Sequence, residues 1–265
     1  MEIKEYVKNK KSLLKEKIDS LKVTPHLVII QVNNDEASNA YVKGKIKDLT
    51  LINARFTHIL LDVDTKMDEL IDLINKFNKD DDVDGILVQM PLPKHINEQI
   101  IKETILPEKD VDGFHPMSTM VPCTPKGIID YLKDLKIEFT SKNAVVIGRS
   151  NIVGKPVAKL LLGLNCNVTI LHSKTKEEDM NRYLENADIV VVAVGKKEFI
   201  KEQKLKPTCI LVDVGINRVD GKLYGDCAQN LNVALQTPVP GGVGLLTRVS
   251  MLENLLLCYE LRRGK

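Results

Sequence analysis

Apolar residues in this chain follow two alternating patterns that predict different elements. Short runs rich in β-branched residues are typical of buried strands, and longer stretches with apolar side chains every three or four positions are typical of helices. The strand-like runs lie at 26–32, 55–61, 85–90, 144–148, 167–171, 188–195 and 209–215, and the helix-like stretches at 2–21, 38–52, 66–78, 126–135, 153–163, 176–186 and 245–261. This alternation predicts βαβ units built on parallel sheets.

The alternation is interrupted at 107–127, a segment with four prolines and two glycines that predicts a long irregular loop. Loops of this length inside compact domains are usually functional. We therefore expect an α/β protein of two domains with a cleft between them. The first domain is predicted to comprise 1–122 together with the C-terminal helix 245–265, and the second to comprise 123–244.

Composition excludes several classes of function. The chain has 265 residues, 43% of them hydrophobic and 28% charged, which is enough apolar material for a core and excludes a disordered protein. Its 38 basic and 36 acidic residues give a net charge of +2, so neither a nucleic acid nor a membrane is an expected partner. The five cysteines form no C-x-x-C pair, so we expect no metal site and no disulfides, and reduced thiols favour a cytoplasmic protein.

The strand at 144–148 runs directly into Arg-Ser-Asn-Ile-Val-Gly-Lys-Pro and a helix, where parallel sheets commonly bind phosphates. The glycine pattern of dinucleotide-binding turns is incomplete, because Ser150 and Val153 occupy its second and third glycine positions. The spacing of a P-loop also fails. A modified dinucleotide turn remains, with Gly148 in the tight turn and Gly154 against the strand, and it predicts a second domain with a Rossmann-like doubly wound parallel sheet.

The residues after the next strand favour NADP over NAD. An NAD site places Asp or Glu about 20 residues after the glycine turn, on the ribose 2′-hydroxyl. Here that position reads His-Ser-Lys-Thr-Lys, and the first acid is Glu177. Ser173, Lys174 and Arg149 instead offer donors and positive charge that suit a 2′-phosphate. Solvated surface charges explain Arg149 and Lys174 equally well.

Polar residues in the first half are candidates for chemistry. Tyr41 and Lys45 are four residues apart on one helix face, and a lysine desolvated beside a ring becomes usable as a base. A surface lysine along a half-buried ring is the commoner explanation. Gln89 ends a buried strand and either orients the lysine or satisfies loop backbone groups. Asp110 and Asp112 either bind a ligand or form turns, as most such pairs do.

Taken together, these residues lie within eight strings that resemble one known family. In chain order the strings are S-x-x-Y-V-x-x-K (38–45), DGILVQMPLPKHI (84–96), PEKDVDGFHP (107–116), PCTPKG (122–127), VVIGRSNIVGKPVAKLL (145–161), HSKT (172–175), DVGIN (213–217) and TPVPGGVG (237–244). Over essentially its whole length the chain resembles the bifunctional methylenetetrahydrofolate dehydrogenase/methenyltetrahydrofolate cyclohydrolase family. A shikimate-dehydrogenase-like oxidoreductase also pairs two α/β domains, but would not require these strings together.

The resemblance implies two consecutive reactions. The first oxidises 5,10-methylenetetrahydrofolate to the 5,10-methenyl cation with NADP, and the second hydrolyses that cation to 10-formyltetrahydrofolate. Lys45 would be the main catalytic group, assisted by Gln89, Tyr41 and Asp112. The residues implied for folate binding are Tyr41, Gln89, Asp112, Pro240, Gly241 and Gly242, and those implied for NADP binding are Gly148, Arg149, Ser150, Ile152, Val153, Ser173, Gly195 and Ile216. The resemblance also implies a homodimer.

Two stretches depart from the family pattern. Only Met-Ser-Thr-Met-Val separates GFHP from PCTP, where the family has a longer loop, so we expect an effect on nicotinamide placement. Leu245 and Leu246 follow PGGVG where the family has proline and then Met or Phe, which is expected to free the start of the last helix. A cyclohydrolase with weakened dehydrogenase and a degenerate NADP- or folate-binding sensor are therefore alternative hypotheses.

Overall fold

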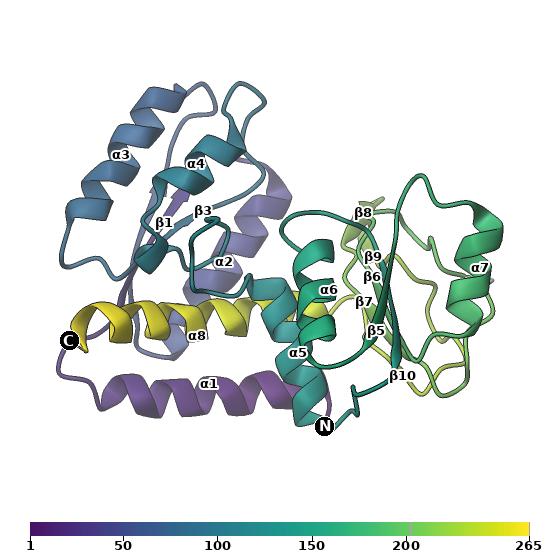
Figure 1. The fold of residues 1–265 in the computed structure, drawn as a ribbon. Coiled ribbons are helices and arrows are strands. Elements are labelled where there is room, and N and C mark those ends of the chain that lie inside the picture. The colour runs from purple at the N-terminus through teal and green to yellow at the C-terminus, as the bar shows by residue number, and fades with distance from the viewer. Residues whose placement is uncertain (202, 265) are drawn as a thin grey trace. The chain divides into compact units, whose positions relative to one another are not determined.

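The computed structural model describes residues 1–201 and 203–264, and its chain forms two compact units that we name by their sheets. The five-stranded unit contains Met1–Val7 and Thr124–Thr247, and the three-stranded unit contains Lys8–Cys123 and the chain from Arg248 onward. Both sheets are parallel and carry helices, which confirms the predicted α/β class (Figure 1). Residue 265, the last of the predicted C-terminal segment, lies outside the described residues.

The three-stranded unit is built around a central strand that is buried along nearly its whole length. Its elements are β1 (His26–Gln31), α2 (Glu36–Leu51), β2 (Arg55–Leu60), α3 (Met67–Lys79), β3 (Gly85–Val88), α4 (Glu98–Thr104) and the 3₁₀ helix η1 (Pro107–Lys109). The strand order is β2-β1-β3, and Leu27–Ile30 of the central strand have no exposed surface. Continuous aliphatic runs of this kind are typical of strands covered on both faces.

Local capping explains where two helices begin. Helix α2 starts two residues before the predicted position, because the side chain of Asp35 accepts a hydrogen bond from the backbone N–H of Ser38 at 2.9 Å. Helix α4 was not predicted. It spans only seven residues, and the Asn97 side chain caps it by accepting from the N–H groups of Gln99 and Ile100.

The five-stranded unit has the strand order β10-β7-β6-β4-β5. Its elements are α5 (Cys123–Asp134), β4 (Asn143–Ile147), α6 (Gly154–Gly163), β5 (Asn167–Leu171), α7 (Glu177–Glu185), β6 (Ile189–Val192), β7 (Ile210–Asp213), β8 (Asn217–Val219), β9 (Lys222–Tyr224) and β10 (Leu235–Gln236). The chain adds β5 on one side of β4 and then β6, β7 and β10 on the other. This reversal confirms the doubly wound, Rossmann-like sheet, whose ligands bind beyond the carboxyl ends of the strands at the reversal.

Parts of the secondary structure differ from the prediction. The hairpin of β8 and β9 and the edge strand β10 were not predicted, because each strand has only two or three residues. The segment 107–127 is not one irregular loop. It opens with η1, and helix α5 begins at Cys123, three residues before the predicted start. The irregular part is therefore 110–122.

Two long helices belong to both units. These are α1 (Ile3–Asp19) and α8 (Val243–Arg263), as the division of the chain places their first residues in the five-stranded unit and the rest in the three-stranded unit. Helix α8 starts before Leu245, whose backbone N–H donates to the carbonyl of Gly242 at 2.9 Å. A proline at this position has no N–H to donate. Leu245 thus makes a helical hydrogen bond that proline could not make, and the effect of losing the proline on the freedom of the helix start stays a prediction.

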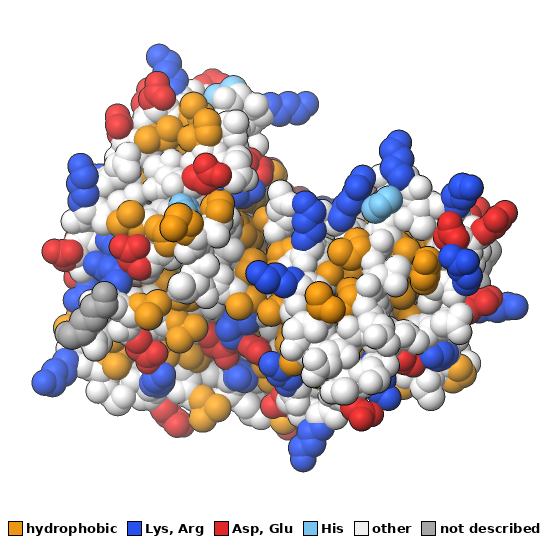
Figure 2. Space-filling view, in the orientation of Figure 1, with side chains coloured by type: hydrophobic (Ala, Val, Ile, Leu, Met, Phe, Trp, Pro, Cys, Tyr) orange, Lys and Arg blue, Asp and Glu red, His pale blue; other side chains and the backbone are white. Residues whose placement is uncertain are grey.

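Two features bear on the expected partners: the distribution of charge on one face and the character of the helices. On the face shown in Figure 2, basic and acidic side chains are interspersed. Within residues 1–201 and 203–264, no helix has the length and apolar character needed to cross a membrane.

Candidate active site and cofactor pocket

A buried lysine lies at the carboxyl end of the three-stranded sheet. Lys45 projects from α2 and is 4% exposed, and its Nζ donates to Oε1 of Gln89, which follows β3, at 3.0 Å. The same Nζ lies 5.0 Å from the centre of the Tyr41 ring, one helical turn earlier. Gln89 is oriented by its own amide, whose Nε2 donates to the carbonyl of Met90 at 2.6 Å. The structure thus brings together three of the four predicted catalytic residues.

Asp112, the fourth, acts on the same lysine electrostatically. Burial lowers the pKa of Lys45 below its ordinary value, and the charges of Asp112 and Cys123 oppose that shift. Burial also raises the pKa of Asp112, against the opposing effects of Lys45 and Lys102. Both shifts favour neutral groups, so the lysine has an amine form at lower pH than an exposed lysine has. A neutral amine can accept a proton, which an ammonium cannot do.

The two aspartates of the long loop have different functions. The carboxylate of Asp110 accepts from the backbone N–H groups of Gly113 at 3.0 Å and His115 at 2.8 Å, and burial raises its pKa to about 6. Asp110 therefore builds the turn. Asp112 is only half-buried and makes no such turn contacts among the hydrogen bonds of the described residues. The turn interpretation therefore holds for Asp110, and ligand binding by Asp112 stays a prediction.

The sequence analysis did not identify two buried residues that contact this loop, one at its end and one on α8. The Sγ of Cys123 lies 3.3 Å from the carbonyl of Val111 and 4.0 Å from Oδ1 of Asp112. Asn254 of α8 has no exposed surface, and its Nδ2 donates to the carbonyls of Val111 at 2.9 Å and Val121 at 3.0 Å. One amide therefore holds both ends of the short loop. Cys123 lies in the string PCTPKG, but no pattern marks Asn254.

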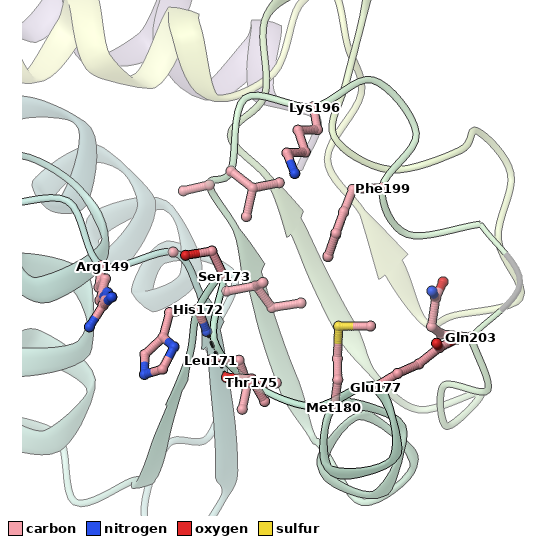
Figure 3. Close-up of a pocket in the computed structure, with 14 residues that line it drawn as sticks. Arg149, Leu171, His172, Ser173, Thr175, Glu177, Met180, Lys196, Phe199 and Gln203 are labelled. Atoms are coloured by element: carbon pink, nitrogen blue, oxygen red, sulfur yellow. Dashed lines mark hydrogen bonds between the residues drawn. The ribbon is translucent and has the colours of Figure 1, made fainter.

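A cavity of about 640 Å³ lies at the carboxyl ends of β4, β5 and β6 (Figure 3). Figure 3 shows Arg149 and His172 on one side of it and Lys196 and Phe199 on the other. Its lining residues are Ile147, Gly148, Arg149, Leu171, His172, Ser173, Thr175, Glu177, Met180, Ala193, Val194, Lys196, Phe199 and Gln203. The sequence predicted Gly148, Arg149 and Ser173. It missed His172 and Thr175, although both lie in the string HSKT, and no pattern marks Lys196 or Phe199.

The turn between β4 and α6 requires its two glycines. Gly148 has φ +118°, and a Cβ there would lie 2.3 Å from the carbonyl oxygen of Ala193. A Cβ at Gly154 would lie 2.3 Å from the carbonyl oxygen of Gly148. The predicted functions of both glycines, in the tight turn and in close helix packing, are confirmed. The Oγ of Ser150 accepts from the N–H groups of Val153 and Gly154 at 3.2 Å each and so caps α6.

The other predicted residues do not line this cavity. Ile152 and Val153 lie in the turn that precedes α6, and Ile216 is 58% exposed between β7 and β8. The exposed Lys174 also lies outside the cavity lining, so the structure favours the surface-charge interpretation for it. The residues Pro240, Gly241 and Gly242 form the turn between β10 and α8 and belong to the five-stranded unit.

Gly195, another predicted residue, lies in a turn whose backbone N–H groups donate to a buried aspartate of the same chain. The carboxylate of Asp226 has no exposed surface and accepts from the N–H groups of residues 194, 195 and 196 at 2.7, 2.9 and 2.9 Å. It also accepts from Nδ2 of Asn217 at 2.9 Å. Three consecutive N–H groups of this kind often bind an anion, and here the anion is a side chain. The N–H groups of residues 194–196 are therefore occupied by a side chain of the protein itself.

Known proteins match the chain along nearly its whole length. The model of the tetrahydrofolate dehydrogenase/cyclohydrolase catalytic domain matches residues 1–112, and that of the NAD(P)-binding domain matches residues 122–263. The chain belongs to the tetrahydrofolate dehydrogenase/cyclohydrolase family. This confirms the resemblance that the eight strings carry.

Relatives and solved structures of the tetrahydrofolate dehydrogenase/cyclohydrolase family agree. The bifunctional protein FolD of Staphylococcus epidermidis is 47% identical over 98% of this chain and 96% of its own length. The crystal structure of bifunctional FolD from Campylobacter jejuni has a TM-score of 0.94 at 39% identity, covering 98% of both chains. FolD from Trypanosoma brucei, solved with NADP and an inhibitor, has a TM-score of 0.94 at 29% identity, covering 98% of this chain and 97% of that one. Shikimate dehydrogenase from Aquifex aeolicus, with a TM-score of 0.52 at 14% identity over 91% of this chain and 93% of that one, shares the fold alone.

The Asp226 contacts predict a selective loss of cofactor binding in D226N. An amide accepts hydrogen bonds through one atom instead of two, so at least one pair of the partly buried N–H donors loses its acceptor and the turn at residues 194–196 is held less firmly. We expect the dissociation constant for NADP, measured by calorimetry, to rise about tenfold or more. The control is D188N, because Asp188 also accepts from a backbone N–H, but from that of Asn143, which does not line the cavity, whereas Asp226 holds Val194 and Lys196, which do. Unchanged NADP affinity in folded D226N would contradict this assignment.

Proposed function

We propose that this member of the tetrahydrofolate dehydrogenase/cyclohydrolase family oxidises 5,10-methylenetetrahydrofolate with NADP and hydrolyses the methenyl product to 10-formyltetrahydrofolate. The observation that carries the proposal is the buried Lys45, hydrogen-bonded to Gln89 and with a lowered pKa. Membership of the family supports it, as does the bifunctional assignment of relatives such as the Staphylococcus epidermidis protein.

In the hydrolytic step, water attacks the cationic carbon between N5 and N10 of the folate. The attacking oxygen must lose a proton, and the neutral amine of Lys45 accepts it. Gln89 accepts an N–H of the same amine, which aims the nitrogen lone pair away from the amide. The bond from the carbon to N5 then breaks, N5 takes a proton, and the formyl group stays on N10. An ammonium would also repel the cationic substrate. By favouring the neutral amine, burial therefore both supplies a proton acceptor and removes this repulsion.

Tyr41 and Asp112 supply the contacts that hold the pterin. The Tyr41 ring is half-buried beside Lys45 and offers a flat face for stacking. Asp112 offers two carboxylate oxygens to the amino and ring N–H donors of a pterin. We also assign the turn at Pro240, Gly241 and Gly242 to folate binding, as the family pattern implies.

The cavity beside β4 and β5 fits NADP better than NAD. Arg149, Ser173 and His172 place positive charge and donors where a 2′-phosphate would bind. The ring Nδ1 of His172 accepts a hydrogen bond from the backbone N–H of Lys174 at 3.2 Å, which leaves the other ring nitrogen, Nε2, as a donor. The acid lining the cavity, Glu177, starts α7 and lies beside Gln203 in Figure 3 instead of following β5 directly.

The turn at Gly148–Gly154 and the N-terminus of α6 would hold the pyrophosphate. The chemistry supplied by bound NADP would be that of a hydride acceptor for the methylene carbon. The chain needs no acid or base for that step, so its residues contribute by positioning the reactants. The remaining residues implied for NADP binding, Ile152, Val153, Gly195 and Ile216, are retained in the proposal as neighbours of the bound cofactor.

A homodimer in the cytoplasm is part of the same proposal. The five cysteines are buried thiols that form no disulfide with one another, which supports a reducing compartment. Sedimentation of the purified chain would give its oligomeric state.

The function is tested by supplying 5,10-methylenetetrahydrofolate with NADP or NAD and following reduced nicotinamide and methenyl-folate together. Reduction of NADP without accumulation of methenyl-folate is the expected result. Hydrolysis of added methenyl-folate without reduction of either cofactor would favour a cyclohydrolase with a weakened dehydrogenase. The absence of both reactions would leave the sensor hypothesis.

Replacing the proposed base should separate the two reactions. We expect K45M to lower the rate of methenyl-folate hydrolysis by at least about 10²-fold, the usual contribution of a general base, while retaining part of the hydride transfer. Both rates are measured on the same preparation, with melting temperature as the control for folding. Equal loss of both activities in a folded variant would refute this function of Lys45.

The charge of Asp112 predicts a shift in pH dependence. This charge raises the pKa of Lys45, so D112N should lower that pKa further. Hydrolysis requires the neutral amine, so its rate rises with pH through the pKa of Lys45, and the rising limb should move to lower pH in D112N. The profile of kcat/KM against pH reports this pKa in the free enzyme. A limb that stays in place, or moves to higher pH, would contradict the electrostatic pairing.

A further inference from the structure

A cluster of three charges, buried at Asp48 and Lys11 and partly buried at Arg248, joins the helix that carries Lys45 to two other helices. Asp48, on α2, is 2% exposed. Its Oδ1 accepts from Nζ of Lys11 on α1 at 2.5 Å, and its Oδ2 accepts from Nε of Arg248 on α8 at 2.7 Å. All three residues belong to the three-stranded unit.

The guanidinium of Arg248 also lies directly on the backbone of α2. A Cβ built at Gly44 would lie 2.2 Å from Nη1 and 3.1 Å from Cζ of Arg248. Any side chain at position 44 would therefore displace the arginine. Glycine is less favourable than alanine in a helix interior, so close packing is a physical reason for glycine here.

These contacts fix the position of α2 next to Lys45, the proposed base. Gly44 and Asp48 are four residues apart and share one face, and Tyr41 and Lys45 share the neighbouring face. A rotation or slide of α2 that separates Arg248 from Gly44 and Asp48 therefore also moves the Nζ of Lys45 relative to Gln89. Lys11 neutralises part of the Asp48 charge, whereas the three heavy atoms nearest to a Cβ at Gly44 all belong to Arg248.

We propose that Arg248 is a positioning residue for the hydrolytic reaction, and that the missing side chain of Gly44 leaves the room that its guanidinium occupies. Through the Gly44 backbone and the Asp48 carboxylate, Arg248 sets the position of α2 at which the Lys45 amine meets both Gln89 and the substrate. The inference rests on the proposed function, because it assigns Arg248 to the reaction in which Lys45 is the base.

The test uses R248M, G44A and the double variant G44A/R248M. A misplaced catalytic group costs up to about 10²-fold in rate, so each single variant should lower kcat for methenyl-folate hydrolysis about tenfold or more, with KM nearly unchanged. The double variant should be no slower than R248M, because the methyl group then has no guanidinium to displace. A general gain in helix propensity predicts the opposite for G44A, namely full activity and a higher melting temperature.

The matched control is E253Q, which removes a different ion pair between α1 and α8, that of Lys10 and Glu253 at 3.2 Å. It should leave hydrolysis unchanged. Wild-type rates in G44A, multiplied losses in the double variant, or a fall in hydride transfer equal to the fall in hydrolysis would each overturn the proposal. The unaltered chain and K45M are assayed alongside. If the unaltered chain hydrolyses methenyl-folate and K45M does not, then full hydrolytic activity in R248M and G44A refutes this inference alone. If the unaltered chain does not hydrolyse methenyl-folate, both proposals fail.

Discussion

The arrangement of the three-stranded unit depends on the burial of one amine. A charged lysine removed from water is costly unless it is paired or neutral, and Lys45 has an amide oxygen at 3.0 Å and a half-buried aspartate whose own pKa is raised. Three elements must therefore be held in register: helix α2, the end of β3 and the loop that carries Asp112. Asn254 and Arg248, both on α8, contact the loop and α2 respectively, so one helix bears on both sides of the lysine.

In the five-stranded unit, side chains accept hydrogen bonds from backbone N–H groups in the turns that follow its strands. Such groups are costly when they are buried without a partner, and three side chains accept from several of them. Ser150 caps α6, Asp226 binds the turn after β6, and Asp213 accepts from residues 215, 226 and 227. Side chains of the unit therefore accept from these N–H groups themselves. The two units thus contribute different features, a desolvated amine in one and backbone turns held by side chains in the other.

Much of this could be predicted from sequence, and the failures have physical causes. Long β-branched runs identify the buried strands of both sheets, because their burial is continuous along the chain. The hairpin at 217–224 and the strand at 235–236 are too short to show any period. Gln89 and Lys45 are 44 residues apart, so their contact follows from topology and from the family resemblance, not from spacing. Asp226 and Asn254 bind backbone groups remote in the chain, which no local pattern records.

The central claim is that burial keeps the Lys45 amine deprotonated at lower pH than an ordinary lysine. It is tested most directly by an NMR titration of the chain labelled with ¹³C at the lysine ε-carbons, with K45M used to assign the resonance. The account predicts a midpoint for Lys45 below the ordinary lysine value of 10.5, apart from the exposed lysines of the same sample. A Lys45 resonance that titrates together with the exposed lysines, or above them, would contradict it.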